Sequence, residues 1–174
     1  AIIGITEVIL GGLYGPLTGK QADRLQTVRR NAHNLLTLIN NLLDISEIAA
    51  GRLEMTFETV YIQQELEGVI ASHKSQASAK GLTLDMDLAE GLPPVRGDVT
   101  RVHQVLDNLL SNAVKFTETG HISVKAYPHQ HQGRAWVHCA VQDTGIGIAP
   151  QHQAIIFDEF RQVDGSATRE YGGT

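Results

Sequence analysis

The chain has 174 residues, of which 42% are hydrophobic and 19% are charged, and its formal net charge is -5 at pH 7. This balance excludes a disordered tail, and the scattered lysines and arginines exclude the basic stretch that nucleic-acid binding requires. Cys139 is the only cysteine, which excludes a disulfide framework and a cysteine-rich zinc site. The sequence contains no run of the about 20 apolar residues that a helix needs to span a bilayer. We therefore expect a globular protein of a reducing, cytoplasmic compartment, with any membrane anchor outside this sequence.

The first 50 residues have the pattern of a helical hairpin. "AIIGITEVIL" predicts a short apolar helix, and "GGLYGPLTGKQ" supplies the glycines and the proline of a helix-to-helix connection. In the long helix that follows, apolar residues recur at spacings of three and four, namely Leu25, Val28, Ala32, Leu35, Ile39 and Leu42, and Leu36, Leu38, Leu43 and Ile45 widen this stripe. We expect this helix to be buried along much of its circumference. Since two helices cannot bury such broad faces alone, we expect a second copy to complete a four-helix bundle.

A change in composition marks a domain boundary between Gly51 and Tyr61. The glycine is expected to end the long helix, because glycine readily adopts the backbone conformation that closes helices. We therefore assign residues 1–55 to a helical domain and residues 56–174 to a second domain.

Helix and strand patterns follow one another in the second domain. In chain order we expect a helix at residues 62–80, a strand at 82–88, a turn at 90–98, a helix at 98–116, strands at 121–127 and 135–143 joined by a polar loop at 128–134, and a final helix. Asp98 is expected to cap the second helix, whose apolar side is formed by Val102, Val105, Leu106, Leu109, Leu110 and Ala113. This order predicts an α+β fold with an α/β sandwich, in which helices cover one face of a mixed sheet.

Asn108, Asn112 and Lys115 share one face of the helix at 98–116, because they are spaced by four and three residues. An amide oxygen is a neutral ligand that suits Mg²⁺ and adds no negative charge beside a triphosphate. Lys115 would then neutralise a phosphate oxygen as a mobile point charge. The same three residues are also compatible with an ordinary solvated helix face, so these positions alone leave both interpretations open.

Residues 143–148, "DTGIGI", follow the last predicted strand and also allow two interpretations. In the first they form a plain turn, in which Gly145 and Gly147 take backbone angles that other residues avoid and Asp143 caps the turn. In the second they belong to a nucleotide site, where the Asp143 carboxylate accepts a hydrogen bond from the exocyclic amine of adenine. Guanine would face this carboxylate with an acceptor oxygen, so adenine would be preferred.

Two later segments complete a set of motifs that resembles a known family. "FDEF" places Phe157 and Phe160 three residues apart, as an anchor for a loop, and "GSATREYGGT" is typical of a mobile glycine-rich segment that folds over phosphates. The ordered segments "DNLLSNAVKF", "DTGIGI", "FDEF" and "YGGT" resemble the N, G1 and F boxes and the start of the G2 box of sensor histidine kinases, the phosphoryl donors of two-component signalling. "YGPLTGKQADRL" and the long helix after it resemble the second half of their dimerisation and phosphotransfer hairpin. The resemblance covers nearly the whole chain.

This resemblance implies an ATP-dependent protein histidine kinase core of the GHKL superfamily, a transferase and phosphoprotein that uses ATP and Mg²⁺ and forms a homodimer through the hairpin. It would transfer the γ-phosphoryl group of ATP to a hairpin histidine, for relay to an aspartate of a response-regulator receiver domain. The resemblance implies Asn112 as the Mg²⁺ ligand, and Asn108 and Lys115 as catalytic residues. It implies an ATP-binding set of Asn108, Asn112, Lys115, Phe116, Asp143, Gly145, Gly147, Ile148, Phe157, Phe160, Gly172, Gly173 and Thr174.

Two other functions remain as alternatives. ATPases related to DNA gyrase and Hsp90 carry a glutamate four residues before the metal-binding asparagine, where it activates water. Asn108 stands at that position, and an amide cannot take a proton from water, so phosphoryl transfer is favoured over hydrolysis. The second alternative is a catalytically silent, dimeric nucleotide-binding scaffold for a response regulator. The presence of Asn112 and Asp143 argues against it.

The sequence departs from the family pattern at both ends. In the family the acceptor histidine lies in a His-Glu-x-x-Arg-x-Pro-Leu segment just before the residues that match "AIIG", and none of the eight histidines here is followed by an acid in that pattern. We therefore expect that the chain as given does not phosphorylate itself. We also expect the ATP-binding domain to be truncated after the start of its second glycine box, which would weaken nucleotide binding.

Overall fold

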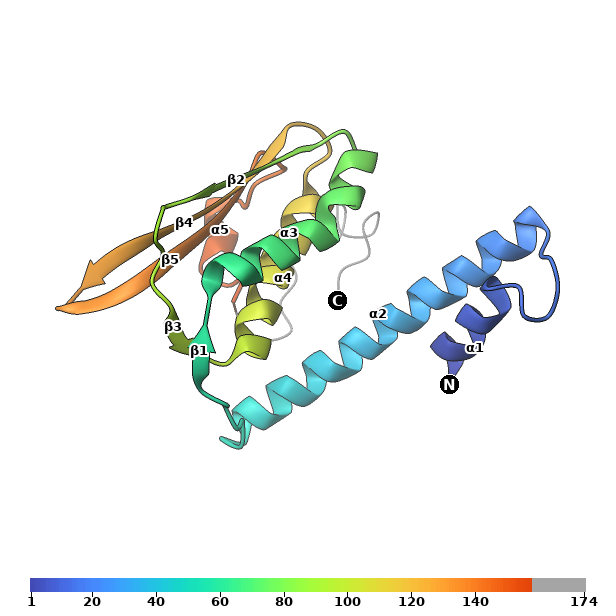
Figure 1. Cartoon of the computed structure of the whole chain (residues 1–174), viewed down its shortest axis with the longest axis horizontal. Helices are drawn as coiled ribbons and strands as arrows, with labels where there is room; N and C mark the ends of the chain where they lie inside the picture. The colour runs from blue at the N-terminus through green and yellow to red at the C-terminus, as the bar shows by residue number, and fades with distance from the viewer. Residues whose placement is uncertain (158–174) are drawn as a thin grey trace. The chain divides into compact units, whose positions relative to one another are not determined.

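The structure is a computed structural model of the chain and describes residues 1–157. The chain divides into two compact units, of which the first comprises Ala1–Glu54 and the second begins at Met55 (Figure 1). Each unit has its own secondary structure and is described separately. Among the described residues, no helix combines the length and the apolar character needed to cross a bilayer.

The first unit contains two helices, α1 (Ile2–Leu10) and α2 (Gly19–Ala49). Helix α2 begins six residues before the first predicted seam residue, because Thr18 and Gln21 form a capping box in which each side chain satisfies the other residue's backbone N–H. Gly51 follows the helix with a φ of 63° and donates its N–H to the Ile48 carbonyl oxygen. This confirms that Gly51 ends the long helix.

The apolar stripe of α2 is exposed among the described residues. No residue of α2 is buried, and Leu35, Ile39 and Leu42 are 56%, 46% and 47% exposed. Helix α1 does not supply the expected burial, so burial by a second hairpin stays a prediction. The reason is geometric, because the nine residues of α1 can cover only a small part of a 31-residue helix.

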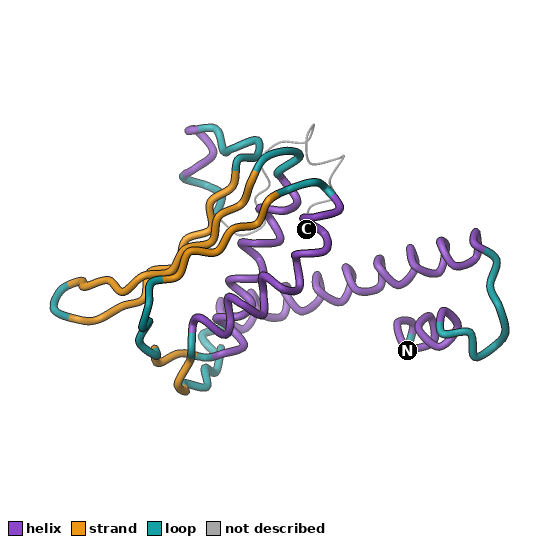
Figure 2. The backbone as a smooth tube through the Cα atoms, turned by 45° about the horizontal axis from the view of Figure 1, so that its top comes forward, coloured by secondary structure: helices purple, strands orange, loops and turns teal. Residues whose placement is uncertain are grey.

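The second unit contains two sheets with helices packed against the larger one. Its elements are β1 (Glu58–Val60), α3 (Ile62–Ala79), β2 (Thr83–Leu88), β3 (Val95–Gly97), α4 (Val99–Phe116), β4 (His121–His131), β5 (Arg134–Asp143) and α5 (Pro150–Gln153). Strand β2 pairs parallel to β4, and β4 pairs antiparallel to β5. Figure 2 shows these three strands side by side, with α3 and α4 on one face. The predicted mixed sheet covered by helices is therefore confirmed.

Two predicted connections contain strand structure. The turn expected at residues 90–98 includes β3, which pairs antiparallel with β1 in a separate two-stranded sheet. The polar loop expected at residues 128–134 is largely strand, because β4 continues to His131 and β5 begins at Arg134. Only Gln132 and Gly133 form the turn, and both have the positive φ angles that tight hairpin turns require. The polar composition of residues 128–134 did not indicate a strand, because both faces of this part of the hairpin are exposed.

The hydrophobic core lies between the larger sheet and helices α3 and α4. Its buried apolar residues are Val60, Ile62, Leu66, Val69, Ala77, Leu82, Leu106, Leu110, Ala113, Val114, Ile122, Val124 and Ala126. On α4 this differs from the predicted face, because Val105 and Leu109 are 57% and 44% exposed. The buried face is centred on Leu106 and Leu110, so Val105 and Leu109 lie on its flank, on the side of Asn112.

Candidate functional site

Helix α4 carries the first group of predicted site residues, and its start is fixed by Asp98. The Asp98 carboxylate accepts hydrogen bonds from the backbone N–H groups of Thr56, at 2.9 Å, and Arg101, at 3.1 Å. These bonds, that from Thr56 foremost, hold the pKa of Asp98 below its usual value of 3.8. The cap therefore joins the beginning of the second unit to the helix that presents the predicted site.

The two asparagines lie on the open side of α4. Asn108 and Asn112 are exposed one turn apart, and Phe116 follows Asn112 by four residues. The spacing of Val105, Leu109, Asn112 and Phe116 places them along one helix face. This face combines an amide ligand with apolar side chains, which is a suitable surface for a planar base and a metal-bound phosphate.

Lys115 and Phe116 form the last turn of α4. The Lys115 Nζ atom lies 5.0 Å from the centroid of the Phe116 ring, within the range of a cation–π contact. Partial burial lowers the pKa of the Lys115 ammonium group from its usual value of 10.5. A partly dehydrated ammonium group interacts more strongly with an approaching anion than a fully hydrated one.

The segment 143–148 is anchored at two points. The Asp143 carboxylate accepts a hydrogen bond from the Gly145 N–H at 2.8 Å, as in an Asx turn. The Thr144 hydroxyl accepts a hydrogen bond from the His121 N–H at 3.0 Å, at the start of β4. The Ile146 N–H donates to the Phe116 carbonyl oxygen at 3.3 Å. These contacts bring the end of α4 and the segment after β5 together.

Gly145 and Gly147 are required for different reasons. A Cβ atom at Gly145 would clash with the Phe116 carbonyl oxygen, so only glycine lets the segment pass this close to α4. Gly147 instead has a φ of 67°, which favours glycine, and there is open space around it. The plain-turn interpretation accounts for Gly147, whereas Gly145 is required by a tertiary contact.

The structure thus brings Phe116, Asp143, Gly145 and Ile146 together, with Lys115 and Asn112 on the adjoining turn of α4. Ile148 is 48% exposed and Phe157 is 89% exposed. The predicted site residues Phe160, Gly172, Gly173 and Thr174 lie outside the described residues.

Sequence analysis missed two backbone anchors of this site. Thr144 stands inside the quoted motif, and a hydroxyl directly after a strand could have suggested a hydrogen bond to a neighbouring backbone. The N–H of Ile146 gave no signal, because its partner, the Phe116 carbonyl, lies 30 residues earlier and is brought near only by the fold.

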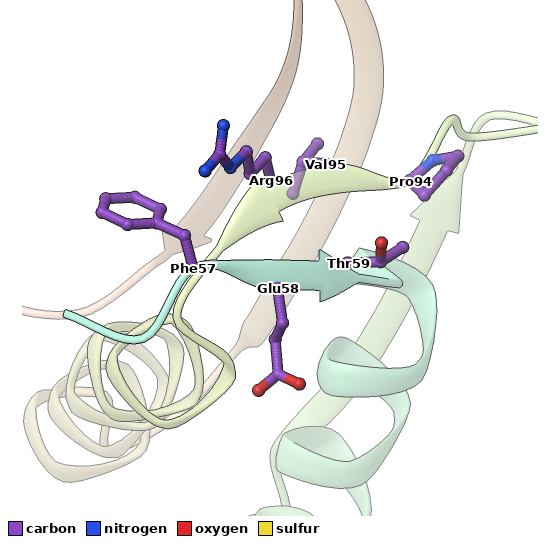
Figure 3. A pocket seen from close by; sticks show the side chains of 6 residues that line it. All are labelled: Phe57, Glu58, Thr59, Pro94, Val95 and Arg96. Atoms are coloured by element: carbon purple, nitrogen blue, oxygen red, sulfur yellow. The ribbon is translucent and has the colours of Figure 1, made fainter.

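A separate pocket of about 340 Å³ lies on the small sheet formed by β1 and β3 (Figure 3). Six residues line it, namely Phe57, Glu58, Thr59, Pro94, Val95 and Arg96. The Arg96 guanidinium carbon lies 5.7 Å from the centroid of the Phe57 ring, whereas Glu58 points the other way. None of the predicted site residues is among the lining residues, so this pocket is distinct from the candidate site.

The described residues contain no group of three or more His, Cys, Asp or Glu side chains arranged to hold a metal ion. At many phosphoryl-transfer sites Mg²⁺ keeps several waters, binds phosphate oxygens and has few protein ligands. The exposed amide of Asn112 fits such a donor set.

Comparison with known proteins finds similarity to histidine kinases along the chain. A family model described as histidine kinase-, DNA gyrase B-, and HSP90-like ATPase matches residues 97–174. The signal transduction histidine-protein kinase BarA of Escherichia coli (strain K12) is 35% identical over 175 residues, which cover 99% of this chain and 19% of BarA. The circadian input-output histidine kinase CikA of Thermosynechococcus vestitus is 36% identical over 177 residues, which cover 99% of this chain and 24% of CikA. The chain spans about a fifth of the length of these relatives.

The fold is also similar to that of a solved histidine kinase. Full-length ShkA, crystallised in complex with AMPPNP, has a TM-score of 0.74 and 31% sequence identity to this chain. The match covers 96% of this chain and 35% of ShkA. This similarity confirms the predicted α+β fold, with a helical hairpin ahead of an α/β domain of the ATPase type.

Proposed function

The chain carries a catalytic domain of the sensor histidine kinase family, in the superfamily that also holds DNA gyrase B and HSP90, and on that premise we propose that it is an ATP-dependent protein histidine kinase core. In this proposal the second unit binds Mg²⁺-ATP, and the γ-phosphoryl group moves to a histidine of a hairpin like that of residues 1–54. The bond between the γ-phosphorus and the bridging oxygen breaks, a phosphorus–nitrogen bond forms, the imidazole loses its proton and ADP leaves.

One observation carries the proposal. The Ile146 N–H and the Phe116 carbonyl join the end of α4 to the segment 143–148, at 3.3 Å. On α4 the Lys115 ammonium group lies 5.0 Å from the Phe116 ring centroid, and on the other segment the Asp143 carboxylate accepts a hydrogen bond from Gly145, which passes close to the Phe116 carbonyl. A carboxylate acceptor beside a cation matches a nucleotide, which has a donor amine on its base and anionic oxygens on its phosphates.

Each residue of this surface has a separate proposed task. Asp143 accepts a hydrogen bond from the adenine amine, and Gly145 and Gly147 allow the backbone to approach the base. Lys115 neutralises phosphate charge, and the partial burial of its ammonium group strengthens the attraction to phosphate. Asn112 would hold Mg²⁺, which supplies further charge neutralisation to the phosphates. Catalysis is then mainly positioning and electrostatic stabilisation.

Asn108 supports transfer to histidine over hydrolysis. It lies exposed one turn before Asn112 on α4, at the position where a water-activating glutamate would be required. An amide has no basic site that could take a proton from water at neutral pH. An imidazole acceptor does not need such a base, because its neutral nitrogen is already nucleophilic.

The exposed stripe of α2 supports a homodimer as the working form. Leu35, Ile39 and Leu42 lie on one side of α2 and are exposed among the described residues, and a second hairpin would bury them in a four-helix bundle. We propose that a response-regulator receiver domain then accepts the phosphoryl group on an aspartate. The family supports both proposed partners, and the exposed stripe of α2 supports the second copy.

Replacement of Asn112 by alanine tests the proposal. We expect Asn112→Ala to weaken Mg²⁺-AMPPNP binding to the full chain by about tenfold, the usual scale for loss of a group that supports a metal site. Isothermal titration calorimetry with and without Mg²⁺ measures this, and the loss should appear only with Mg²⁺. In a chain extended with residues before Ala1, the same change should abolish acid-labile phosphorylation, as followed by intact mass spectrometry. Gln76→Ala, at an exposed position on α3, is the control. Retained phosphorylation in Asn112→Ala would contradict the metal role.

A further inference from the structure

The C-terminal end of α4 is held by a residue from another helix. Lys80 follows the last residue of α3, and its Nζ atom donates to the carbonyl oxygens of Val114 at 2.8 Å, Lys115 at 3.0 Å and Thr117 at 3.4 Å. An ammonium group has three protons in a roughly tetrahedral arrangement, so one side chain can serve several carbonyls of one helix end.

These bonds complete the hydrogen bonding of α4. The last four carbonyls of a helix have no partner within it. In α4 the Ala113 carbonyl accepts from the Thr117 N–H, the Val114 and Lys115 carbonyls accept from Lys80, and the Phe116 carbonyl accepts from the Ile146 N–H. Lys80 therefore supplies two of these four partners, and its positive charge lies at the negative end of the helix dipole, where it is favourable.

Helix α3 brings Lys80 to this place because it runs alongside α4 in the same direction. Glu65 near the start of α3 contacts His103 near the start of α4, at 3.0 Å. His73 in the middle of α3 contacts Asp107 in α4, at 2.8 Å. The hydrogen bonds from Lys80 to the Val114 and Lys115 carbonyls are the last of these contacts along the two helices. They fix the C-terminal ends of α3 and α4 beside one another.

The turn that Lys80 holds is the turn that carries the candidate site. Lys115 and Phe116 belong to it, and the Phe116 carbonyl holds the segment 143–148 through Ile146. Gly145 passes so close to this carbonyl that a Cβ atom would clash with it. A change in the path of residues 114–117 therefore moves both the phosphate-facing lysine and the base-facing segment.

We propose that Lys80 is a positioning residue of the nucleotide site, which it shapes through the carbonyls at the end of α4 without touching the nucleotide. This inference rests on the proposed nucleotide-binding function of the same site. Removal of the ammonium group leaves the Val114 and Lys115 carbonyls to water and loosens the last turn of α4. Nucleotide affinity should then fall even though the core and the residues that face the nucleotide are unchanged.

The test compares three variants of the full chain. Lys80→Met keeps the length of the side chain and removes the charge and the donors, and Lys80→Arg keeps both. Lys74→Met, at an exposed position of the same helix, is the matched control. Mg²⁺-AMPPNP affinity is measured by isothermal titration calorimetry at a temperature where circular dichroism shows all the proteins folded. We expect Lys80→Met to raise Kd by about tenfold, as for loss of other outer supports of a site, with Lys80→Arg and Lys74→Met within about twofold of the parent.

The outcomes separate this inference from the proposed function. If the parent chain binds Mg²⁺-AMPPNP and Lys80→Met binds it equally well, the positioning role is wrong and the proposed function stands. If the parent does not bind the nucleotide, both are wrong. A second readout is amide hydrogen exchange without nucleotide, in which Lys80→Met should accelerate exchange at Thr117 and Ile146 and leave Val124 in the sheet unchanged. Unchanged exchange at Thr117 and Ile146 would overturn the inference.

Discussion

Helices α2 and α4 are both amphipathic, but only α4 buries its apolar face within the chain. Helix α4 has four buried residues in 18, namely Leu106, Leu110, Ala113 and Val114, and a sheet and a parallel helix surround them. Helix α2 has none in 31. Thr6 is the only buried residue among residues 1–54, and every buried apolar side chain among the described residues belongs to the second unit.

The difference concerns where each helix obtains its stability. The second unit brings together strands and helices that cover one another, so its core forms without help from another molecule. The first unit has only a short helix beside a long one, and its apolar stripe is available to a second hairpin. Mutations on the two helices should therefore have different effects, on folding in α4 and on association in α2.

The largest effect is expected for the core of α4. Leu110 is 1% exposed, and Leu110→Ala should lower the free energy of unfolding of the second unit by about 2 to 5 kcal/mol, from lost burial and the cavity left behind. Urea denaturation followed by circular dichroism measures this. Leu35→Ala makes the same chemical change on α2, and it should alter that transition by less than about 0.5 kcal/mol. Equal losses from both variants would remove the distinction between the two helices.

A charge on the stripe of α2 should act on association instead. Leu35→Lys places an ammonium group on the face that a second hairpin would cover, so the proposed dimer should dissociate to monomers. Light scattering over a range of protein concentrations measures this, and Gln26→Lys, at an exposed polar position of α2, is the control. A dimer that persists in Leu35→Lys would show that another surface joins the chains.

A smaller effect is expected from one methyl group at the candidate site. Gly145→Ala places a Cβ atom against the Phe116 carbonyl, so the segment 143–148 must shift and Mg²⁺-AMPPNP should bind about tenfold more weakly, a change of 1.4 kcal/mol. Gly68→Ala, in the middle of α3 with nothing within 4 Å of its added Cβ, should leave binding unchanged and stabilise the helix slightly. Equal affinity of the two variants would mean that the close approach at Gly145 does not shape the site.

The smallest effect concerns the cap of α4 and its pH dependence. Backbone hydrogen bonds lower the pKa of Asp98 in the folded chain, so the unfolded chain binds its proton more readily. The stabilisation by Asp98 is therefore present above its unfolded pKa and is lost as the pH falls through the folded pKa. We expect the melting temperature Tm, measured by thermal unfolding between about pH 5 and pH 3, to fall less steeply with decreasing pH in Asp98→Asn than in the parent. Asp85→Asn, at an exposed position of β2, is the control. Identical pH dependence in Asp98→Asn and the parent would contradict this assignment.

Local chemistry made much of the fold predictable. Gly51 ends α2 through Ile48 and Asp98 caps α4 through Arg101, so a short sequence window predicts both helix ends, although it does not predict the further bond from Thr56 to Asp98. The mixed sheet followed from strand alternation and from the order of the elements. The part of the hairpin at residues 128–134 was harder to predict, since all of its residues are exposed and no buried face imposes an apolar period.

The sequence by itself determined the family, the order of the elements and the residue types available for a nucleotide. Only the tertiary structure decided which face of α4 is buried, why Gly145 must be glycine, and that Lys80 serves the carbonyls at the end of α4. The physical reason is distance along the chain. The Phe116 carbonyl lies 30 residues from the Ile146 N–H, and the Val114 and Lys115 carbonyls lie 34 and 35 residues from Lys80. Such contacts depend on how two helices and a sheet pack, and no local pattern encodes them.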